Sequence, residues 1–384
     1  MMPENAKDFL KKCIEFYSPS GSEEKYAQFL FEFLKNHEFN VKFDKVGNLI
    51  AEKGKGKPEL LFVSHMDTIP GKLPIIEKEG KIFGRGAVDC KPSLASMVYS
   101  IAKYDLEKLK VGKIIFGGIV REEDSLIGIQ EFLKSNIKPD YSIFGEPTTI
   151  NQICIGYKGR LCLSHRIFTK AGHVASSWQY INAIEIALEI WNIIKGVCWQ
   201  LTEEKCLSNE PKEYYNKVIP NLSVITGGKL TNVVPSDCMI QVDIRFPPQI
   251  KSQVLLSKIR KSIEDFKIVY ESNVNGEFQI QESISSLVEG FEIKNDELII
   301  GALRWAIYKT TNIKPKLIKK TGTTFINQIG LEYKIPSITY GPGDPKLEHT
   351  EDEFIEIDEY LQCIEIYSKF IDKIYENFQK KHGT

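Results

Sequence analysis

Three apolar segments of this chain each end in acidic or histidine side chains, and this recurrence restricts the folds that the chain can adopt. Continuous apolar runs of this length are typical of strands buried on both faces of a parallel sheet. The segments and the residues that follow them are 60–63 with His65, 113–120 with Glu122 and Glu123, and 140–144 with Glu146. In open α/β sheets, ligands bind beyond the carboxyl ends of the strands. The sequence therefore predicts an α/β domain whose central, mostly parallel sheet gathers these side chains at one edge.

The same edge is expected to receive one more aspartate and one more histidine. Asp89 ends the glycine-containing segment 84–89 just before a helical pattern, and His349 follows the last apolar segment, 336–340. Solvated loop residues would explain any one of these cases, but they do not easily explain all of them. After His349, the spacing of Thr350 and Glu353 indicates a capping box that precedes a C-terminal helix over 358–379.

Two imidazoles and three carboxylates at this edge form a candidate set of metal ligands: His65, His349, Asp89, Glu123 and Glu146. This mixture suits zinc, cobalt or manganese better than calcium or magnesium. Five ligands are too many for one tetrahedral ion with an open position, whereas they suit two divalent ions about 3.5–4 Å apart that share one carboxylate. Asp67 is expected to fix the tautomer of His65, and Glu122 is the candidate general base.

The composition describes a globular protein of two domains. The chain has 384 residues, and its net charge of −1 provides no basic excess for binding nucleic acid. Its eight cysteines include no Cys-x-x-Cys pair, which argues against a thiolate zinc site and against a disulfide framework. No apolar run is long enough to cross a membrane. We therefore expect a cytoplasmic protein.

The pattern of apolar residues changes near Gly156, where a second domain is expected. Predicted elements over residues 154–271 follow in the order β-α-β-β-α-β, which is that of a ferredoxin-like α+β unit. This order includes a strand at 267–271, and the polar segment 200–217 is interpreted as an insertion loop. We predict a catalytic domain in two parts, 1–155 and 291–384, with an inserted domain at 156–290.

The motifs resemble those of a family of two-metal amidohydrolases that includes acetylornithine deacetylase, succinyl-diaminopimelate desuccinylase, aminoacylase and carboxypeptidase G. The motifs that carry the resemblance span nearly the whole chain: Ser64-His65-Met66-Asp67, Gly84-Arg85-Gly86-Ala87-Val88-Asp89, Glu122-Glu123, Gly145-Glu146-Pro147-Thr148, Gly172-His173 and Glu348-His349-Thr350. The resemblance implies a zinc-peptidase-like catalytic domain and an inserted lid domain through which two copies form a homodimer.

The resemblance also implies roles for individual residues. Asp89 would bridge the two ions, with His65 and Glu146 completing one site and Glu123 and His349 completing the other. Glu122 would take a proton from the attacking water and pass it to the leaving amine. His173 would reach the partner subunit's site and stabilise the oxyanion. The expected substrate contacts are Asn232, Arg245, Gly322 and Thr323, although a purely structural role for Asn232 and Arg245 is the alternative.

Within the family, the segments Thr339-Tyr340-Gly341-Pro342-Gly343 and Leu347-Glu348-His349-Thr350 look most like those of hydrolases in lysine and ornithine biosynthesis. These enzymes release lysine or ornithine from an acidic amino-group carrier protein by cleaving a γ-glutamyl amide, and relatives act on acetyl-lysine or acetylornithine. Phe325 departs from the pattern, because relatives commonly carry an acid there, and this leaves recognition of a basic side chain open. The alternatives are a general aminoacylase or dipeptidase, and a catalytically silent homologue that binds a conjugate.

Overall fold

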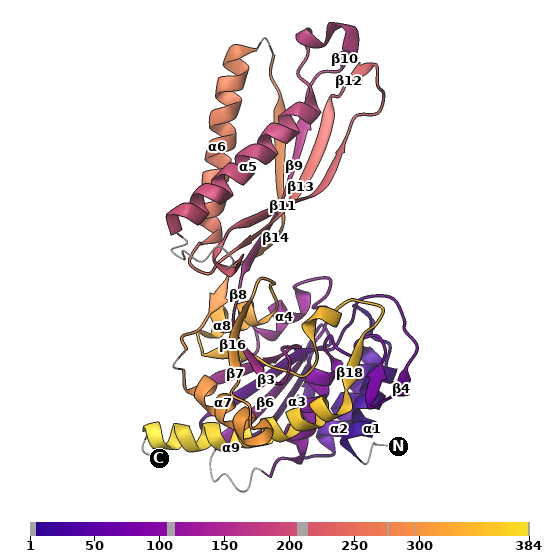
Figure 1. The fold of residues 1–384 in the computed structure, drawn as a ribbon, viewed down its shortest axis with the longest axis vertical. Helices are drawn as coiled ribbons and strands as arrows, with labels where there is room; N and C mark the ends of the chain where they lie inside the picture. Colours follow the sequence, from indigo (N-terminus) through magenta and orange to yellow (C-terminus); the bar gives the residue numbers. More distant parts are fainter. Residues whose placement is uncertain (1–4, 106–111, 206–213, 275, 296, 383–384) are drawn as a thin grey trace. The chain divides into compact units, whose positions relative to one another are not determined.

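The computed structural model describes residues 5–105, 112–205, 214–274, 276–295 and 297–382. The chain forms two compact units (Figure 1). The first comprises residues 1–156, 293–319 and 324–384, and the second comprises residues 157–292 and 320–323. Within the described ranges, no helix combines the length and the apolar character that a membrane span requires.

The first unit is a sheet with helices on both faces. Its helices are α1 (Ala6–Glu15), α2 (Glu24–Lys35), α3 (Lys91–Lys103), α4 (Ile127–Phe132), α7 (Leu298–Thr311), α8 (Ile326–Tyr333) and α9 (Ile357–His382). Its strands are β1 (Asn40–Phe43), β2 (Leu49–Lys55), β3 (Glu59–His65), β4 (Ile76–Lys78), β5 (Lys81–Phe83), β6 (Gly112–Ile119), β7 (Tyr141–Gly145), β8 (Gln152–Tyr157), β16 (Lys316–Lys320), β17 (Ser337–Thr339) and β18 (Phe354–Glu356).

The central sheet of this unit brings the carboxyl ends of its middle strands to one edge. Its strands lie in the order β1-β2-β6-β3-β7-β17-β8, and β16 pairs with β8. The strands β6, β3, β7 and β17 run parallel. In register, Ser64 of β3 lies opposite Gly118 of β6 and Gly145 of β7, so these strands end level with one another. The predicted α/β fold with a mostly parallel sheet is confirmed.

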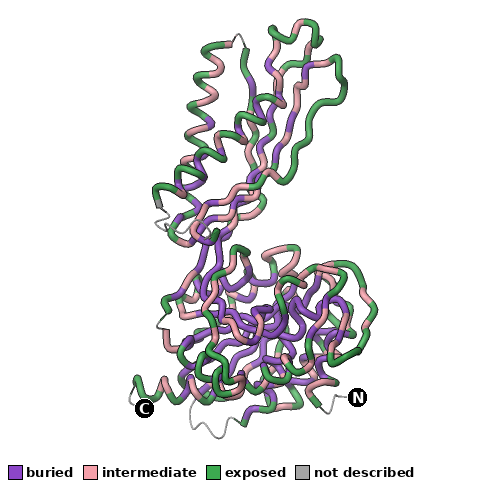
Figure 2. Tube along the Cα trace, viewed as in Figure 1, coloured by how far each residue is buried: buried purple, intermediate pink, exposed green. Residues whose placement is uncertain are grey.

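Alternate residues of the parallel strands face two different layers of helices. Phe62 of β3 packs edge-on against Tyr367 and Phe370 of α9. Phe144 of β7 points to the other face, where its ring lies against Phe325 at the start of α8. Because both faces are covered, the strands are buried almost throughout (Figure 2). This double burial explains why the strands read as continuous apolar runs.

The second unit is an antiparallel sheet with two helices packed on it. Its main elements are β9 (Gly159–Phe168), α5 (Ala183–Lys205), β11 (Ile219–Gly227), β13 (Asp237–Phe246), α6 (Ser252–Asn273) and β14 (Gln279–Val288). Its short elements are β10 (Gly172–His173), η2 (Val174–Gln179), η3 (Tyr214–Asn216), β12 (Val233–Val234) and β15 (Phe291–Glu292). The strand order β11-β13-β9-β14, combined with the β-α-β-β-α-β chain order, is the predicted ferredoxin-like arrangement.

One strand of this unit was predicted in the wrong place. Helix α6 continues to Asn273 through residues 267–271, and the last strand of the sheet is β14, which begins at Gln279. The prediction was wrong because Ile268, Val269 and Tyr270 have side chains that favour strands. In the helix, Tyr270 instead packs edge-on against Phe278, and this tertiary contact outweighs the local preference.

Helix α5 also extends further than predicted. It reaches Lys205 because Val197, Cys198 and Leu201 are buried in the core of this unit. The predicted insertion loop at 200–217 therefore begins inside a helix and includes η3, and its residues 206–213 lie outside the described ranges.

Candidate metal centre

His65, the last residue of β3, is buried and is contacted through both ring nitrogens. Its Nδ1 lies 2.9 Å from the carbonyl oxygen of Asp67 and 3.4 Å from Oδ1 of the same residue. Its Nε2 lies 3.0 Å from Oδ1 of Asp89 and 3.5 Å from Oε1 of Glu146. Because Asp67 can accept the Nδ1 proton, the neutral ring presents its Nε2 lone pair toward two carboxylates, as a metal ligand requires.

Asp89 lies between the two histidines. Its Oδ1 is 3.0 Å from Nε2 of His65, and its Oδ2 is 3.1 Å from Nε2 of His349. Oε1 of Glu123 is also 3.1 Å from Nε2 of His349. The structure thus brings the five residues into two groups that share Asp89, with Glu146 on the side of His65. A carboxylate that faces two imidazoles through separate oxygens has the arrangement of a bridging ligand.

The acidic side chains shift the titration of both histidines. Hydrogen bonds with Asp89 and a second carboxylate raise the pKa of His349 to about 10. Burial alone would lower the pKa of His65, but its hydrogen bonds with the carboxylates of Asp67 and Asp89 help to hold it well above its usual range. Burial would raise the pKa of Asp89, yet its hydrogen bonds with the two histidines hold it well below its usual range. The cluster therefore stabilises positive charge, whether protons or divalent cations carry it.

Glu122 lies in the turn that follows β6, beside Glu123. The backbone N–H groups of both residues donate to the carboxylate of Asp67, at 2.9 and 3.0 Å. Burial raises the pKa of Glu122 to about 7; His65 opposes this shift, and the negative charges of Glu123, Asp89 and Asp67 add to it. A carboxyl group that titrates near neutral pH is suited to accept a proton and then return it.

Glu353 holds the loop that carries Asp89, a role that the sequence did not reveal. Its buried carboxylate accepts hydrogen bonds from the backbone N–H groups of Gly86, at 3.0 Å, and Asp89, at 3.2 Å. It also accepts a hydrogen bond from the guanidinium group of Arg85, at 2.9 Å. Three donors from one short loop therefore converge on this carboxylate, which restrains the backbone of Asp89.

The position of Glu353 follows from strand pairing and not from helix capping. Strand β18 pairs antiparallel with β5, with Phe354 opposite Phe83, and this brings Glu353 to the loop after β5. The predicted capping box is wrong, because the hydroxyl of Thr350 donates to the carbonyl of Leu347 and α9 begins at Ile357. An acid three residues after a threonine fits both interpretations, and only the long-range pairing distinguishes them.

Two further residues, Cys90 and Thr324, contact the candidate metal ligands. The sequence analysis did not predict either contact. The thiol of Cys90 donates to the carbonyl of His65 at 3.3 Å, and burial raises its pKa to about 12, so it remains a neutral donor. The hydroxyl of Thr324 donates to Oε1 of Glu146 at 3.3 Å. The next residue, Phe325, is buried in the core, so the departure from the family pattern at this position places an aromatic ring there and no charge.

His173 and Asn232 lie together in the second unit. Strands β10 and β12 pair with His173 opposite Val233, and the N–H of Val174 donates to the carbonyl of Asn232 at 3.2 Å. Nδ1 of His173 accepts a hydrogen bond from the N–H of Ala175 at 3.1 Å, so the neutral ring carries its proton on Nε2. Since the side chain is exposed, this Nε2–H is suited to donate to an oxyanion.

Arg245 and Thr323 form another pair in the second unit, at the opposite ends of β9 and β13 from His173. Nη1 of Arg245 donates to the hydroxyl of Thr323 at 3.3 Å, and that hydroxyl donates to the carbonyl of Lys158 at 3.0 Å. Nε of Arg245 donates to Oδ1 of Asp243 at 2.7 Å. Gly322, beside Thr323, is exposed. The predicted substrate contacts therefore divide into two groups within this unit.

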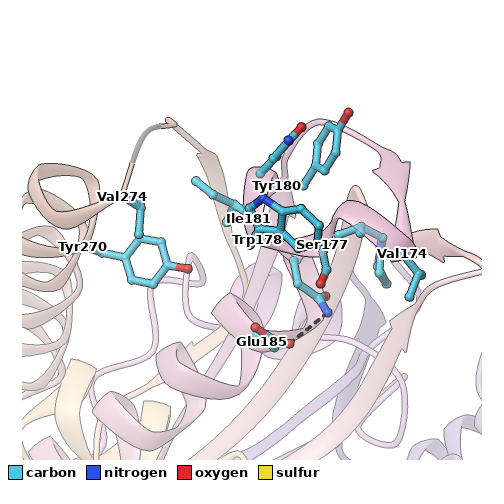
Figure 3. A pocket seen from close by; sticks show the side chains of 12 residues that line it. Val174, Ser177, Trp178, Tyr180, Ile181, Glu185, Tyr270 and Val274 are labelled. Atoms are coloured by element: carbon cyan, nitrogen blue, oxygen red, sulfur yellow. Dashed lines mark hydrogen bonds between the residues drawn. The ribbon is translucent and has the colours of Figure 1, made fainter.

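The second unit also contains a cavity of about 830 Å³ next to the segment that follows His173. Trp178 and Tyr180 lie on one side of it, and Glu185 of α5 lies below Trp178 (Figure 3). Tyr270 of α6 and Val274, which follows the end of α6, lie on the other side. In the described part of the chain, the lining of this cavity includes no predicted site residue.

The chain is similar over nearly its whole length to known hydrolases. A LysW-lysine/LysW-ornithine hydrolase of Sulfurisphaera tokodaii is 30% identical over 372 residues, which cover 96% of this chain and 95% of that protein. A protein of Pyrococcus furiosus that is provisionally given the same name is 34% identical over 377 residues, or 96% of this chain and 97% of that protein.

Solved structures share the fold. A tripeptidase from Staphylococcus aureus superposes with a TM-score of 0.77 at 20% identity, covering 97% of this chain and 98% of that one. An M20 family metallo-carboxypeptidase from Sulfolobus solfataricus superposes with a TM-score of 0.74 at 18% identity, with the same coverage. Residues 61–373 match the profile of peptidase family M20/M25/M40. The chain therefore belongs to this family and is a hydrolase of amide bonds.

Proposed function

We propose that this hydrolase releases lysine or ornithine from a γ-glutamyl conjugate with an acidic amino-group carrier protein. Its relatives in Sulfurisphaera tokodaii and Pyrococcus furiosus, named for LysW conjugates of lysine and ornithine, support this substrate class. The observation that carries the chemistry is the position of Asp89 between His65 and His349. The reaction would serve lysine or arginine biosynthesis in the cytoplasm, where the seven described cysteines, all free, would stay reduced.

We infer that the residues around Asp89 hold two divalent ions, either zinc or cobalt, with manganese as a third candidate. His65 and Glu146 would hold one ion, Glu123 and His349 the other, and Asp89 both. The donor set fits these metals, because it combines two imidazoles with three carboxylates whose ligand atoms lie close together. When bound, such ions polarise the amide carbonyl and make a water molecule more acidic.

Glu122 is the proposed general base. Its carboxyl group, with a pKa of about 7, would take a proton from the attacking water and then give it to the amine that leaves. Asp67 keeps Glu122 in place by accepting its backbone N–H at 2.9 Å, and it also contacts Nδ1 of His65. The intact set of candidate ligands and the presence of Glu122 favour an enzyme over a catalytically silent homologue.

We propose that the second unit forms a homodimer. Strand β11 lies at an edge of its sheet, and Val224 and Ile225 on this strand are exposed. Helix α5, which packs beside β11, exposes Leu188 and Trp199. Large apolar side chains beside an edge strand favour association with a second copy of the chain.

In this dimer, His173 would act on the substrate of the partner subunit. Its Nε2–H would donate to the oxyanion that forms when water attacks the amide carbonyl. Arg245 would hold a substrate carboxylate through its planar guanidinium group, and Asn232, Gly322 and Thr323 would complete the substrate contacts. If Asn232 and Arg245 instead have a purely structural role, replacing them would leave the substrate contacts unchanged.

A comparison of substrates tests the proposed function. The metal-loaded protein is expected to have its highest kcat/KM for γ-glutamyl-lysine or γ-glutamyl-ornithine on the carrier. Acetyl-lysine, acetylornithine, succinyl-diaminopimelate and dipeptides are the competitors in the assay. A Glu122→Gln variant should retain bound metal while its kcat falls by about a hundredfold or more, whereas Asp124→Asn, an exposed neighbour, should leave kcat unchanged. Preference for free acyl-amino acids or for dipeptides would show a deacylase or a peptidase instead.

Hybrid dimers test the proposed action of His173 across subunits. His173→Ala and Glu122→Gln subunits are each expected to be nearly inactive alone. After mixing and subunit exchange, hybrid dimers contain one site with both functional groups intact, so activity should reappear. Mass spectrometry of the intact dimers measures the exchange. Complete exchange without recovered activity would contradict action across the dimer.

Replacement of Glu353 tests whether its contacts hold Asp89 in place for metal binding. In Glu353→Gln, an amide NH₂ group replaces one of the two carboxylate oxygens. It would face either the N–H of Asp89, which donates to Oε1, or the N–H of Gly86 and the guanidinium of Arg85, which donate to Oε2, so the loop should loosen. We expect metal affinity, measured by calorimetric titration, to fall by about tenfold or more. Glu356→Gln, an exposed neighbour that lies 3.5 Å from Lys81, is the matched control and should bind metal normally. Equal affinities for the two variants would exclude this role.

A further inference from the structure

Arg160 and Arg245 lie directly opposite each other in the sheet of the second unit. They are register partners on the antiparallel strands β9 and β13. Neighbouring positions on β13, such as Ile244 and Phe246, are buried in the core, so both arginines point to the face away from the core. Like charges at directly opposite positions destabilise a sheet. This arrangement therefore calls for an explanation other than folding stability.

Asp243 pairs with both arginines. Its Oδ1 accepts a hydrogen bond from Nε of Arg245 at 2.7 Å, and its Oδ2 accepts one from Nε of Arg160 at 2.8 Å. One carboxylate thus balances two guanidinium groups, and the cluster keeps a net positive charge. At the other end of the same strands, Arg166 and Asp237 form a one-to-one pair at 2.9 and 2.8 Å. The excess of one arginine lies at the end of the sheet where Arg245 contacts Thr323.

Arg160 retains hydrogen-bond donors that its protein contacts do not use. It contacts Asp243 through Nε, its side chain is 41% exposed, and its two Nη groups have no hydrogen-bond acceptor among the described residues. Arg245 contacts Asp243 and Thr323 through Nε, Nη1 and Nη2, and it keeps one further N–H on each Nη group for a ligand. A planar guanidinium group with both Nη groups available is suited to bind a carboxylate through two parallel hydrogen bonds.

We propose that Arg160 and Arg245 bind two carboxylates of the substrate, and that Arg160 selects γ-glutamyl over acetyl substrates. This inference rests on the proposed function. The lysine or ornithine part of the substrate carries one α-carboxylate, whether the acyl group attached to it is γ-glutamyl or acetyl. A γ-glutamyl group whose glutamate is free or ends the carrier chain has a second carboxylate on its α-carbon, whereas an acetyl group has none. Two guanidinium groups therefore match the γ-glutamyl substrate, and one would suffice for the acetyl substrate.

Substitution of Arg160 tests the selection. We expect Arg160→Gln to lower the ratio of kcat/KM for Nα-(γ-glutamyl)-lysine over Nα-acetyl-lysine by about tenfold or more, mainly through KM for the γ-glutamyl compound. Arg160→Lys keeps the charge without the planar fork and should give an intermediate ratio. Arg166→Gln removes an exposed arginine from the same strand and should leave the ratio unchanged. An unchanged ratio in Arg160→Gln would overturn the proposal.

Binding measured without turnover separates this proposal from the proposed function. Nα-(γ-glutamyl)-lysine and Nα-acetyl-lysine are titrated calorimetrically into Glu122→Gln and into the double variant Glu122→Gln, Arg160→Gln. Loss of affinity for the γ-glutamyl compound alone supports the role of Arg160, even if the wild-type protein fails to hydrolyse that compound. If the two variants bind the γ-glutamyl compound with equal affinity, the proposed role of Arg160 is overturned, even if the wild-type protein hydrolyses that compound. Because Arg160→Gln removes a like-charge contact, we expect it to remain folded, and Arg160→Lys repeats the test if it does not.

Discussion

The carboxylate of Asp89 is the group on which the rest of the site depends. It contacts His65 through one oxygen and His349 through the other, and Glu123 and Glu146 lie beside those same histidines. So many carboxylates are stable together only if positive charge lies among them. The parallel strands β3, β6 and β7 end level with one another, so the sheet itself concentrates these acids. Affinity for cations therefore follows from the geometry of the sheet.

Buried carboxylates outside the candidate ligand set hold the ligand residues in position. Asp67 accepts hydrogen bonds from the hydroxyl of Ser20, at 2.7 Å, and from the backbone N–H groups of Glu122 and Glu123, at 2.9 and 3.0 Å. Glu353, the residue before β18, plays the same part for the loop of Asp89, although the two are far apart in the sequence. Both use backbone N–H groups as partners, so each restrains a loop that no helix or sheet holds directly.

The parts of the structure that depend on local pattern were predicted from the sequence, and those that depend on long-range pairing were not. The buried strands that lead to His65, Glu122 and Glu146 were evident because double burial leaves continuous apolar runs. Glu353 was misread because its contact with Gly86 joins residues 267 positions apart. Residues 267–271 were predicted as a strand because several of their side chains favour strands. They are helical in the structure, where the packing of Tyr270 on Phe278 outweighs this local preference. The pairing of Arg160 with Arg245 likewise depends on a register that sequence alone does not provide.

The most direct test of the central claim is an anomalous diffraction measurement on crystals of the zinc- or cobalt-loaded protein. We predict two peaks in each subunit, one within bonding distance of His65 and Glu146 and one within bonding distance of Glu123 and His349. Asp89 should contact both through its two carboxylate oxygens. A single peak that Asp89 does not share, or metal bound at other residues, would contradict the account.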